Sequence, residues 1–388
     1  MGKSKIEWTD ATWNPTVGCA LVSPGCTNCY AMKQAARVEK MNPALAHYHG
    51  LTQPSKAGPV WTGKIGIAPE GTLLAPLRWK KPRRIFVNSM SDLFHEDVPD
   101  AVIDRVFAVM ARAPQHIFQV LTKRAKRMRI YMTTSKVADP RDPAPSRAGD
   151  ICCAAMSLNG ELEQNGEYPF TDEQCFVQPD RWPLPNVWLG VSCEDQARAD
   201  ERIPDLLAMP AALRFVSAEP LLGAIDFTRI EIIPHRESRA GIHVNTLTGR
   251  SRESGLPYHF AWDGKGHASS GDAPRLDWII TGGESGPGAR PMHPDWARSI
   301  RDQCAAEGVP LFMKQWGEWA PGECADAPPT RMEKTAEFFD RRWHFGTVSP
   351  KQSEGGHVDD EPDLYRLGKR RAGRTLDGIE HNAMPGNT

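Results

Sequence analysis

Short runs of β-branched and aromatic residues recur along the chain, each followed by a polar cluster and then by apolar residues at helical spacing. The clearest runs occupy residues 85–87, 116–121, 186–191, 213–216, 276–280 and 309–313. A further strand is expected before Cys19, and a weaker one at residues 64–67. The pattern therefore predicts about six to eight units, each a strand followed by a helix.

Nearly continuous apolar strands that alternate with helices indicate a parallel sheet covered on its outer face. With this number of units we expect an α/β fold, a full or partial (β/α) TIM-like barrel, and an open doubly wound sheet is the alternative. One helix is predicted to begin at Pro99-Asp100. Another is expected to place Trp296, Ile300 and Cys304 on one face and to end near Gly308.

Two stretches interrupt this alternation of predicted strands and helices. Residues 133–185 are rich in Pro, Asp, Gly and Ser, and residues 228–275 combine Arg, His, Gly and Ser with little periodicity. We expect both to be irregular insertions in a barrel domain that spans residues 1–324. Residues 325–388 are expected to form a C-terminal appendage.

Composition is that of a globular protein without a strong charge bias. The 388 residues include 47 Lys and Arg against 48 Asp and Glu, and 40% are hydrophobic. No apolar run approaches the roughly 20 residues of a membrane-spanning helix, and the first residues lack the apolar core of a signal peptide. We therefore expect a cytoplasmic protein with no membrane partner, in which the nine cysteines are not a disulfide framework.

Three cysteines crowd together near the start of the chain. Cys19, Cys26 and Cys29 have the spacing C-x6-C-x2-C, and the intervening Ser-Pro-Gly turn allows Cys19 to approach the other two. Three thiolates are one ligand short of a closed structural zinc site, whereas in a [4Fe–4S] cluster they leave one iron open to a small molecule. The residues alone leave both metals possible.

Several motifs carry a resemblance to known families. The chain is similar to an uncharacterised phage-associated family of three-cysteine-motif proteins, and its cysteine loop resembles that of the radical S-adenosylmethionine superfamily. The usual radical enzyme has C-x3-C-x2-C, so the first gap is longer here. The motifs that carry the family match are WTDATWNP (8–15), GCTNCYA (25–31), NSMSDLF (88–94), LTKR (121–124), GGES (282–285) and KQWGEW (314–319).

The superfamily resemblance implies a barrel of the radical S-adenosylmethionine type and a definite chemistry. Cys19, Cys26 and Cys29 would bind a [4Fe–4S] cluster whose open iron binds S-adenosylmethionine. One electron, supplied by a donor such as flavodoxin or ferredoxin, would cleave the cofactor to methionine and a 5′-deoxyadenosyl radical that takes hydrogen from the substrate. Tyr30 follows the last cysteine, as an aromatic residue commonly does in that superfamily.

Polar residues that follow the predicted strands are candidates for binding S-adenosylmethionine. Ser89, Ser91 and Asp92 are suited to its ribose or amino group, with a helix cap as the alternative. Thr122 and Lys123 follow the next strand, where Lys123 is suited to the methionine carboxylate or is a surface lysine. The remaining candidates are Glu194 and Glu219 for the ribose hydroxyls.

Two later residues, Glu284 and Lys314, are candidate catalytic groups. Residues 282–284 invite comparison with the glycine-glycine-glutamate element of radical enzymes, although that element normally follows the second strand. The glycines also suit a tight turn. Cys152, Cys153 and Cys175 are candidate ligands of an additional, second cluster. Cys193 and Cys304 are expected to be packing residues.

Three basic runs suggest a nucleic acid or nucleotide as the substrate to be modified or repaired. They occupy residues 80–84, 123–129 and 369–374. One rival function is a zinc-stabilised, non-catalytic nucleic-acid-binding protein. The other is a metal-independent barrel hydrolase that uses Glu194, Glu219 or Glu284 as paired acid and base.

Overall fold

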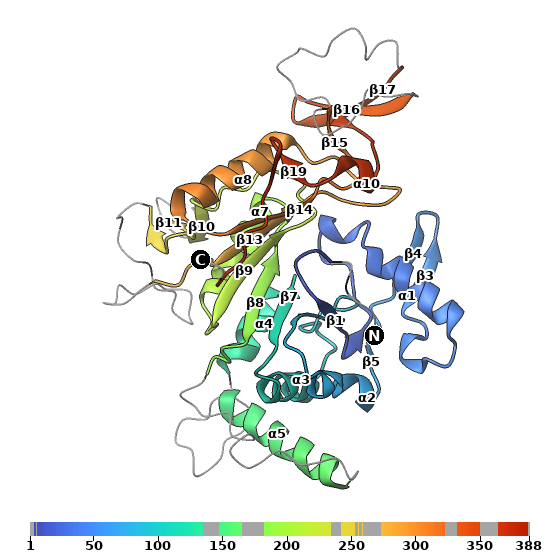
Figure 1. Cartoon of the computed structure of the whole chain (residues 1–388), viewed down its shortest axis with the longest axis vertical. Helices are drawn as coiled ribbons and strands as arrows, with labels where there is room; N and C mark the ends of the chain where they lie inside the picture. The colour runs from blue at the N-terminus through green and yellow to red at the C-terminus, as the bar shows by residue number, and fades with distance from the viewer. Residues whose placement is uncertain are drawn as a thin grey trace.

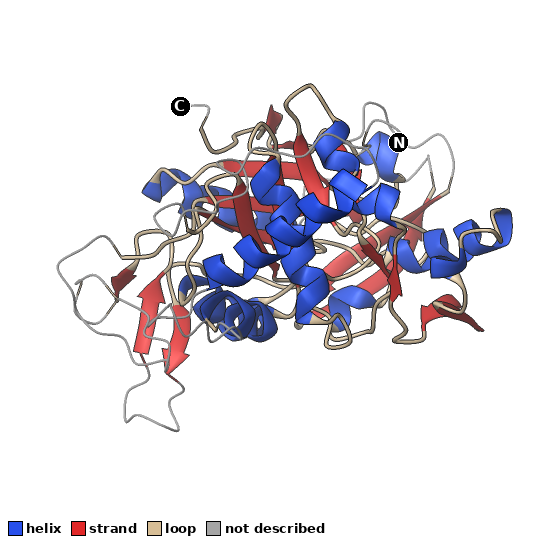
Figure 2. Cartoon of the chain, turned by 90° about the horizontal axis from the view of Figure 1, so that it is seen from below, coloured by secondary structure: helices blue, strands red, loops and turns tan. Residues whose placement is uncertain are grey.

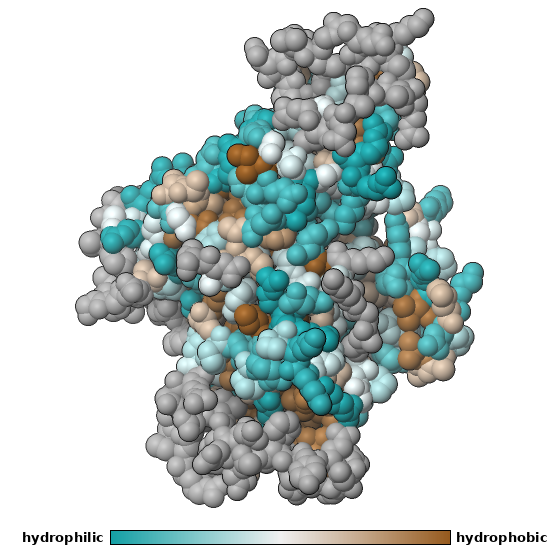
Figure 3. Space-filling view, in the orientation of Figure 1, coloured by the Kyte–Doolittle hydropathy of each residue, from teal (hydrophilic) through white to brown (hydrophobic). Residues whose placement is uncertain are grey.

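A computed structural model gives the architecture of most of the chain. It describes residues 4, 6–134, 147–164, 182–233, 242–252, 255, 258, 273–322, 332–349 and 364–386. None of the helices in these ranges is long and apolar enough to cross a membrane. Figure 3 shows one face of the molecule, where hydrophilic residues predominate and hydrophobic residues form separate small patches.

Seven parallel strands form a curled sheet, a partial barrel, which confirms the predicted α/β class (Figure 1). The strands lie side by side in sequence order, and the first and last are not neighbours, so the described strands leave the barrel open between them. In order they are β1 (Ala11–Trp13), β6 (Arg84–Val87), β7 (Ile117–Thr122), β8 (Val187–Ser192), β9 (Leu213–Ala218), β13 (Trp278–Gly282) and β14 (Leu311–Gln315).

Both faces of this sheet are buried. Successive side chains on a strand point to opposite faces, so neighbouring residues pack into different clusters. Ile279 packs into the large core that the strands share with the helices. Its neighbours Trp278 and Ile280 instead join an aromatic cluster with Phe215 and Phe312. The strands therefore read as continuous apolar runs, and no alternation of polar and apolar residues marks them in the sequence.

Helices pack against the sheet along its length (Figure 2). The predicted start at Asp100 and the predicted end near Gly308 are both confirmed, and Gly308 has the left-handed conformation typical of a residue that follows a helix. The helices are α1 (Tyr30–Met41), α2 (Glu70–Leu73), α3 (Asp100–Arg112), α4 (Ala125–Thr133), α5 (Arg147–Gln164), α7 (Gln196–Leu207), α8 (Pro294–Glu307) and α10 (Lys369–Ala372).

The predicted strand at residues 64–67 does not join the barrel, and that prediction is wrong. Only Gly66–Ile67 (β5) is extended, and it pairs antiparallel with Thr16–Val17 (β2) in a separate small sheet. Next to it, Thr52–Ser55 (β3) and Gly58–Trp61 (β4) form a hairpin. Single turns of 3-10 helix occupy Pro24–Cys26, Ala46–Tyr48 and Ala75–Arg78.

The two predicted insertions are not irregular throughout. Helix α5 lies within the first, and the second contains a small antiparallel sheet of β10 (Ile230–Ile233), β11 (Ile242–Asn245) and β12 (Arg250–Ser251). The remaining parts of both insertions lie largely outside the described residues. Cys175 is among them, so the suggested second cluster with Cys152 and Cys153 stays untested.

The last part of the chain forms a second sheet and then returns to the barrel. The second sheet contains β15 (Ala320–Pro321), β18 (Leu364–Tyr365), β16 (Glu333–Phe339) and β17 (Arg342–Val348), and a hairpin of β19 (Thr375–Leu376) and β20 (Ile379–Glu380) follows. Residues 381–383 then bond to β14, through Met313 N–H to the His381 carbonyl at 2.9 Å and Ala383 N–H to the Leu311 carbonyl at 3.1 Å. They cover an edge strand that would otherwise expose unpaired backbone groups.

The concave side of the half-barrel is filled from two distant parts of the sequence. Trp8 packs edge-to-face on Phe86, with the ring centroids 4.9 Å apart, and also contacts Trp278. Met384 joins the same cluster. Residues before β1 and after β20 thus complete the interior of the sheet, which positions the cavity described next.

Candidate functional site

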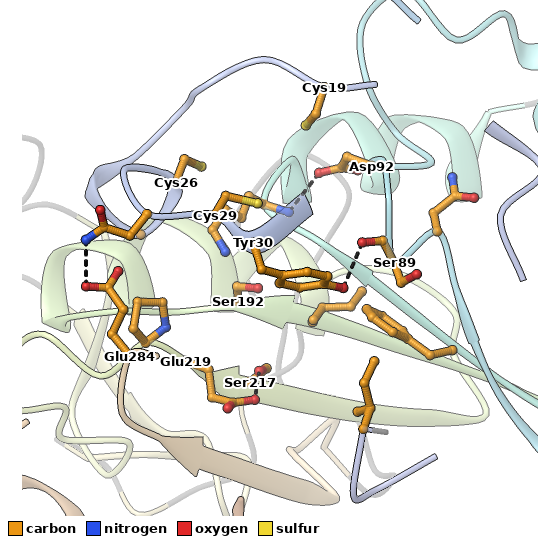
Figure 4. A pocket seen from close by; sticks show the side chains of 18 of the residues that line it. Cys19, Cys26, Cys29, Tyr30, Ser89, Asp92, Ser192, Ser217, Glu219 and Glu284 are labelled. Carbon is orange, nitrogen blue, oxygen red and sulfur yellow. Dashed lines mark hydrogen bonds between the residues drawn. The ribbon is translucent and has the colours of Figure 1, made fainter. Parts of the chain in front are cut away.

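A cavity of about 490 Å³ lies at the carboxyl ends of the parallel strands, where barrel proteins place their binding residues (Figure 4). The loop after β2 forms one wall, and the ends of β6, β7, β9 and β14 contribute others. Every predicted site residue except Glu194 lines this cavity, namely Cys19, Cys26, Cys29, Tyr30, Ser89, Ser91, Asp92, Thr122, Lys123, Glu219, Glu284 and Lys314.

The three thiols lie on the loop that leads into α1. Pro24–Cys26 forms a turn of 3-10 helix, and Cys29 is the residue that caps the start of α1. All three thiols are free and partly buried. Within the part of the chain that the structure describes, no three His, Cys, Asp or Glu side chains are grouped so as to hold a single metal ion.

Arg124 is the cation beside Cys19, with its Nη1 atom 3.7 Å from the Cys19 Sγ. The guanidinium is buried and is fixed by Asp92 at 3.1 Å and Glu96 at 2.8 Å. Burial raises the pKa of the Cys19 thiol to about 12, Asp92 adds to that rise, and Arg124 opposes it. Without a metal the thiol is therefore protonated at neutral pH.

Asp92 ties together the two loops that follow β6 and β7. Its carboxylate accepts hydrogen bonds from the Thr122 hydroxyl at 2.7 Å and from the Lys123 N–H at 3.1 Å. The suggestion that Asp92 caps a helix is wrong, because α3 begins eight residues later with Pro99 as its cap. Asp92 and Thr122 hydrogen-bond to each other, and their role in binding S-adenosylmethionine stays a prediction.

Ser89, Ser91 and Lys123 place hydrogen-bonding groups on the wall between these loops. The Ser89 hydroxyl donates to the Asn14 side chain at 3.1 Å, and the Ser91 hydroxyl accepts from Thr16 at 3.1 Å. Burial raises the pKa of Cys29, and the nearby Lys123 ammonium opposes that rise. Lys123 thus faces the cysteine loop from the cavity wall and is not a detached surface lysine.

Glu219 and Lys314 form an ion pair across the ends of β9 and β14. The Lys314 Nζ lies 3.0 Å from Oε1 and 3.3 Å from Oε2 of Glu219. The Ser217 hydroxyl donates to the same carboxylate at 3.3 Å. Both charged groups remain partly accessible from the cavity, so the pair is available to a ligand.

Glu194, by contrast, is completely buried behind the cysteine loop. Its carboxylate accepts a hydrogen bond from the Gly25 N–H at 3.1 Å and pairs with Arg202 at 3.0 Å. Burial raises the pKa of this carboxyl, but Lys123, Ser23 and Arg202 outweigh it and the net pKa lies below its usual range. Glu194 therefore anchors the loop and does not reach the cavity as a ribose ligand would.

Glu284 anchors the same loop from the other side. It accepts hydrogen bonds from the Asn28 side chain at 2.9 Å and from Arg290, whose Nη2 is 2.7 Å away. Burial raises its pKa, but these bonds more than compensate and the net pKa is lowered. Arg290 also donates to the Pro24 carbonyl at 3.0 Å. These contacts hold Glu284 against the cysteine loop, and its catalytic role stays a prediction.

The two glycines before Glu284 lie where neighbouring atoms leave little room for a side chain. A Cβ atom on Gly283 would lie 1.9 Å from the backbone oxygen of Trp316, and one on Gly282 would lie 2.8 Å from the Glu219 carboxylate. Close approach of the β13 and β14 loops therefore explains Gly283 without a ligand, whereas the atom nearest to Gly282 is the end of the Glu219 side chain, which can move.

We expect Gly283→Ala to lower the free energy of unfolding by about 2–3 kcal/mol, because the backbone of the next strand must move to admit the methyl group. Urea unfolding followed by circular dichroism measures this effect. Gly71→Ala is the control, because its methyl group meets open space and an alanine in helix α2 should leave stability unchanged or raise it by up to about 1 kcal/mol. Equal stability of the Gly283 and Gly71 variants would contradict the packing explanation.

Several cavity residues were not found in the sequence. Arg124 belongs to a basic run, and Asn28 lies between Cys26 and Cys29. Neither residue therefore stands out in the sequence as a separate candidate. Ser192 is the last residue of β8 and Ser217 the last but one of β9, so their position at the end of a predicted strand was an available signal. Cys193 and Cys304 are buried, as predicted for packing residues.

The fold and the cavity define an α/β half-barrel protein with a thiol-lined site at the carboxyl edge of its sheet. The chain belongs to the protein family of unknown function DUF5131, whose model matches residues 3–385. Searches of curated proteins and of solved structures found no match. The family carries no assigned chemistry, so phage association and the radical S-adenosylmethionine resemblance stay predictions.

Proposed function

We propose that this protein is a radical S-adenosylmethionine enzyme in which Cys19, Cys26 and Cys29 hold a [4Fe–4S] cluster. The observation that carries the proposal is the presence of these three thiols on one cavity at the carboxyl edge of a parallel half-barrel. Among the described residues that line it there is no histidine and no fourth cysteine.

This donor set suits a cluster better than a single ion. In a cluster each of the three thiolates binds a different iron, and one iron is left for a small molecule. When bound, the group would supply the electron that cleaves S-adenosylmethionine to methionine and a 5′-deoxyadenosyl radical, which abstracts hydrogen from the substrate.

The chain's own residues would orient the cofactor and the loop. Lys123 offers an ammonium group to the methionine carboxylate, and Ser89 and Ser91 offer hydroxyls on the same wall. Arg124 stands beside Cys19 and would stabilise its thiolate, since a buried cation favours a nearby anion. Glu194 and Glu284 hold the loop in place from its two sides.

A nucleic acid or nucleotide is the substrate class we propose. Lys369, from the third basic run, lines the cavity, where its ammonium pairs with Glu7 at 3.4 Å. Within the second run Lys123 and Arg124 line the cavity, whereas Arg127 and Arg129 do not and pair with Asp100 and Asp205. A reducing cytoplasm with a flavodoxin or ferredoxin donor is the setting in which such an enzyme works.

The rival functions have less support. The hydrolase needs a pair of reachable carboxylates as acid and base, whereas Glu194 does not line the cavity and Glu284 is tied to Arg290. The zinc-binding alternative requires a compact ligand set, and the described side chains form no such set for one ion.

The decisive experiment is anaerobic purification and reconstitution with iron and sulfide, followed by dithionite and S-adenosylmethionine. We expect about four iron and four sulfide per chain and formation of 5′-deoxyadenosine. A colourless protein with one zinc per chain, or a full cluster that yields no 5′-deoxyadenosine, would refute the proposal.

A further inference from the structure

Arg124 is a buried cation on the wall of the cavity, next to the thiols. The residue is 6% exposed and lines the cavity together with Cys19. Its backbone directly precedes α4, and its N–H donates to the Thr122 hydroxyl at 2.8 Å. Its side chain is bound to Glu96 through Nε and to Asp92 through Nη1. The guanidinium is therefore held in position before any group binds in the cavity.

One nitrogen of this guanidinium lacks a hydrogen-bond partner. Nη1 lies 3.1 Å from the Asp92 carboxylate and 3.7 Å from the Cys19 Sγ, and Nε lies 2.8 Å from Glu96. Nη2 is buried as well, yet no described residue accepts a hydrogen bond from it. A charged donor that is left unbonded in the interior destabilises a protein. A bound group with acceptor atoms beside Cys19 would remove this cost.

Arg124 stays charged throughout the neutral pH range. Burial lowers the pKa of its guanidinium, but Asp92, Cys19 and Glu96 outweigh this effect, and the net pKa lies above its ordinary value. The Glu96 side chain is 64% exposed, so solvent screens its charge, whereas the Asp92 side chain is buried. Asp92 and Arg124 thus form a buried charge pair beside Cys19, and loss of the arginine alone would leave a buried carboxylate near the thiol.

The other two thiols have neutral hydrogen-bonding neighbours. The Ser23 hydroxyl lies 3.8 Å from the Cys26 Sγ, and the Ala31 N–H bonds to Cys29. Hydrogen bonds to sulfur and a nearby positive charge both favour the reduced form of an iron–sulfur cluster, because reduction adds an electron. Arg124 combines the two effects at Cys19, so it is suited to favour reduction.

We propose that Arg124 donates hydrogen bonds to the [4Fe–4S] cluster, from Nη1 to the Cys19 thiolate and from Nη2 to a sulfide, and thereby makes the cluster easier to reduce. The inference deepens the proposed function and rests on it for the presence of the cluster. In the step concerned, one electron passes from a donor of the flavodoxin or ferredoxin type to the oxidised cluster. No bond forms or breaks, and Arg124 keeps its proton.

A redox titration of the reconstituted protein tests this role. Dithionite reduces the cluster in the presence of redox mediators and without S-adenosylmethionine, and electron paramagnetic resonance measures the reduced fraction. We expect Arg124→Met to make the cluster tenfold harder to reduce, which is a shift of about 59 mV to lower potential for a one-electron couple. Loss of one charged hydrogen bond has an effect of this size.

Three further variants separate the possible explanations. Arg124→Lys keeps the charge and a donor, and it should recover part of the shift. A double variant with Asp92→Asn and Arg124→Met leaves no buried charge unpaired, so it should fold, and its potential should lie between those of Arg124→Met and the parent. Arg127→Met is the matched control, because Arg127 lies on α4, pairs with Asp100 and does not line the cavity. Its potential should equal that of the parent.

An unchanged potential in Arg124→Met would overturn the proposal, and so would a double variant with the potential of the parent, since Arg124 would then only neutralise Asp92. Weaker binding of S-adenosylmethionine at an unchanged potential would assign the guanidinium to the cofactor carboxylate, which also contradicts the proposal. Failure of the proposed function is distinguishable. A parent protein without a cluster refutes both proposals, whereas a cluster that yields no 5′-deoxyadenosine refutes the radical chemistry and leaves the titration valid.

Discussion

Replacing Cys26 with alanine is expected to abolish cleavage of S-adenosylmethionine and to reduce the iron content of the reconstituted protein to a small fraction of that of the parent. With only Cys19 and Cys29 left, two irons would lack a protein ligand, and clusters are held chiefly by cysteine thiolates. Iron analysis and the visible absorption of the anaerobic protein measure the first effect. Chromatography of 5′-deoxyadenosine measures the second.

Cys304→Ala provides the matched control. Cys304 is a buried packing residue on α8 that does not line the cavity, so its removal should leave iron content and cleavage unchanged. If the Cys26 variant still cleaves S-adenosylmethionine at the parent rate, the thiols are not the ligands and a cysteine-independent reaction must be sought.

Asp92→Ala is expected to lower the free energy of unfolding by about 3 kcal/mol. The change removes the buried carboxylate that pairs with the buried Arg124 guanidinium. The same change frees the Thr122 hydroxyl and the Lys123 N–H. Urea unfolding monitored by tryptophan fluorescence measures the loss. We also expect weaker cluster retention, since Arg124 would no longer be held beside Cys19.

Glu70→Ala tests whether any broken ion pair has this effect. Glu70 pairs with Arg105 at 2.7 Å, but both side chains are well exposed, and such surface pairs contribute less than about 1 kcal/mol. A loss of similar size in the two variants would show that burial of the Asp92 network is unimportant.

The strands of the half-barrel could be predicted because their residues are buried on both faces and form continuous apolar runs. The strand at residues 64–67 was misjudged since Ile65 and Ile67 suit a strand equally well in a small sheet outside the barrel. Pairing of residues 381–383 with β14 could not be predicted. It joins short segments far apart in the sequence, and nothing local marks it.

The same holds for the site: features that are local in the sequence could be predicted, whereas contacts between distant segments could not. Cysteines and polar residues at strand ends reached the cavity because the ends of parallel strands meet at one edge. Glu194 and Glu284 also follow strands, yet each turns toward an arginine whose position depends on the folded loops. The basic run that contains Arg124 was interpreted as part of a nucleic-acid-binding surface, because charge in a sequence does not reveal which side chain is buried.

Closure of the half-barrel by residues 6–8 and by residues 369–384 has a consequence for biosynthesis. A nascent chain that has not reached residue 384 would lack the segment that bonds to β14 and the side chain of Met384, so the interior of the half-barrel would be incomplete. The cysteine loop is made among the first parts of the chain, whereas Lys369, which lines the same cavity, is made among the last. The cluster that we propose would therefore be assembled on a nearly finished fold.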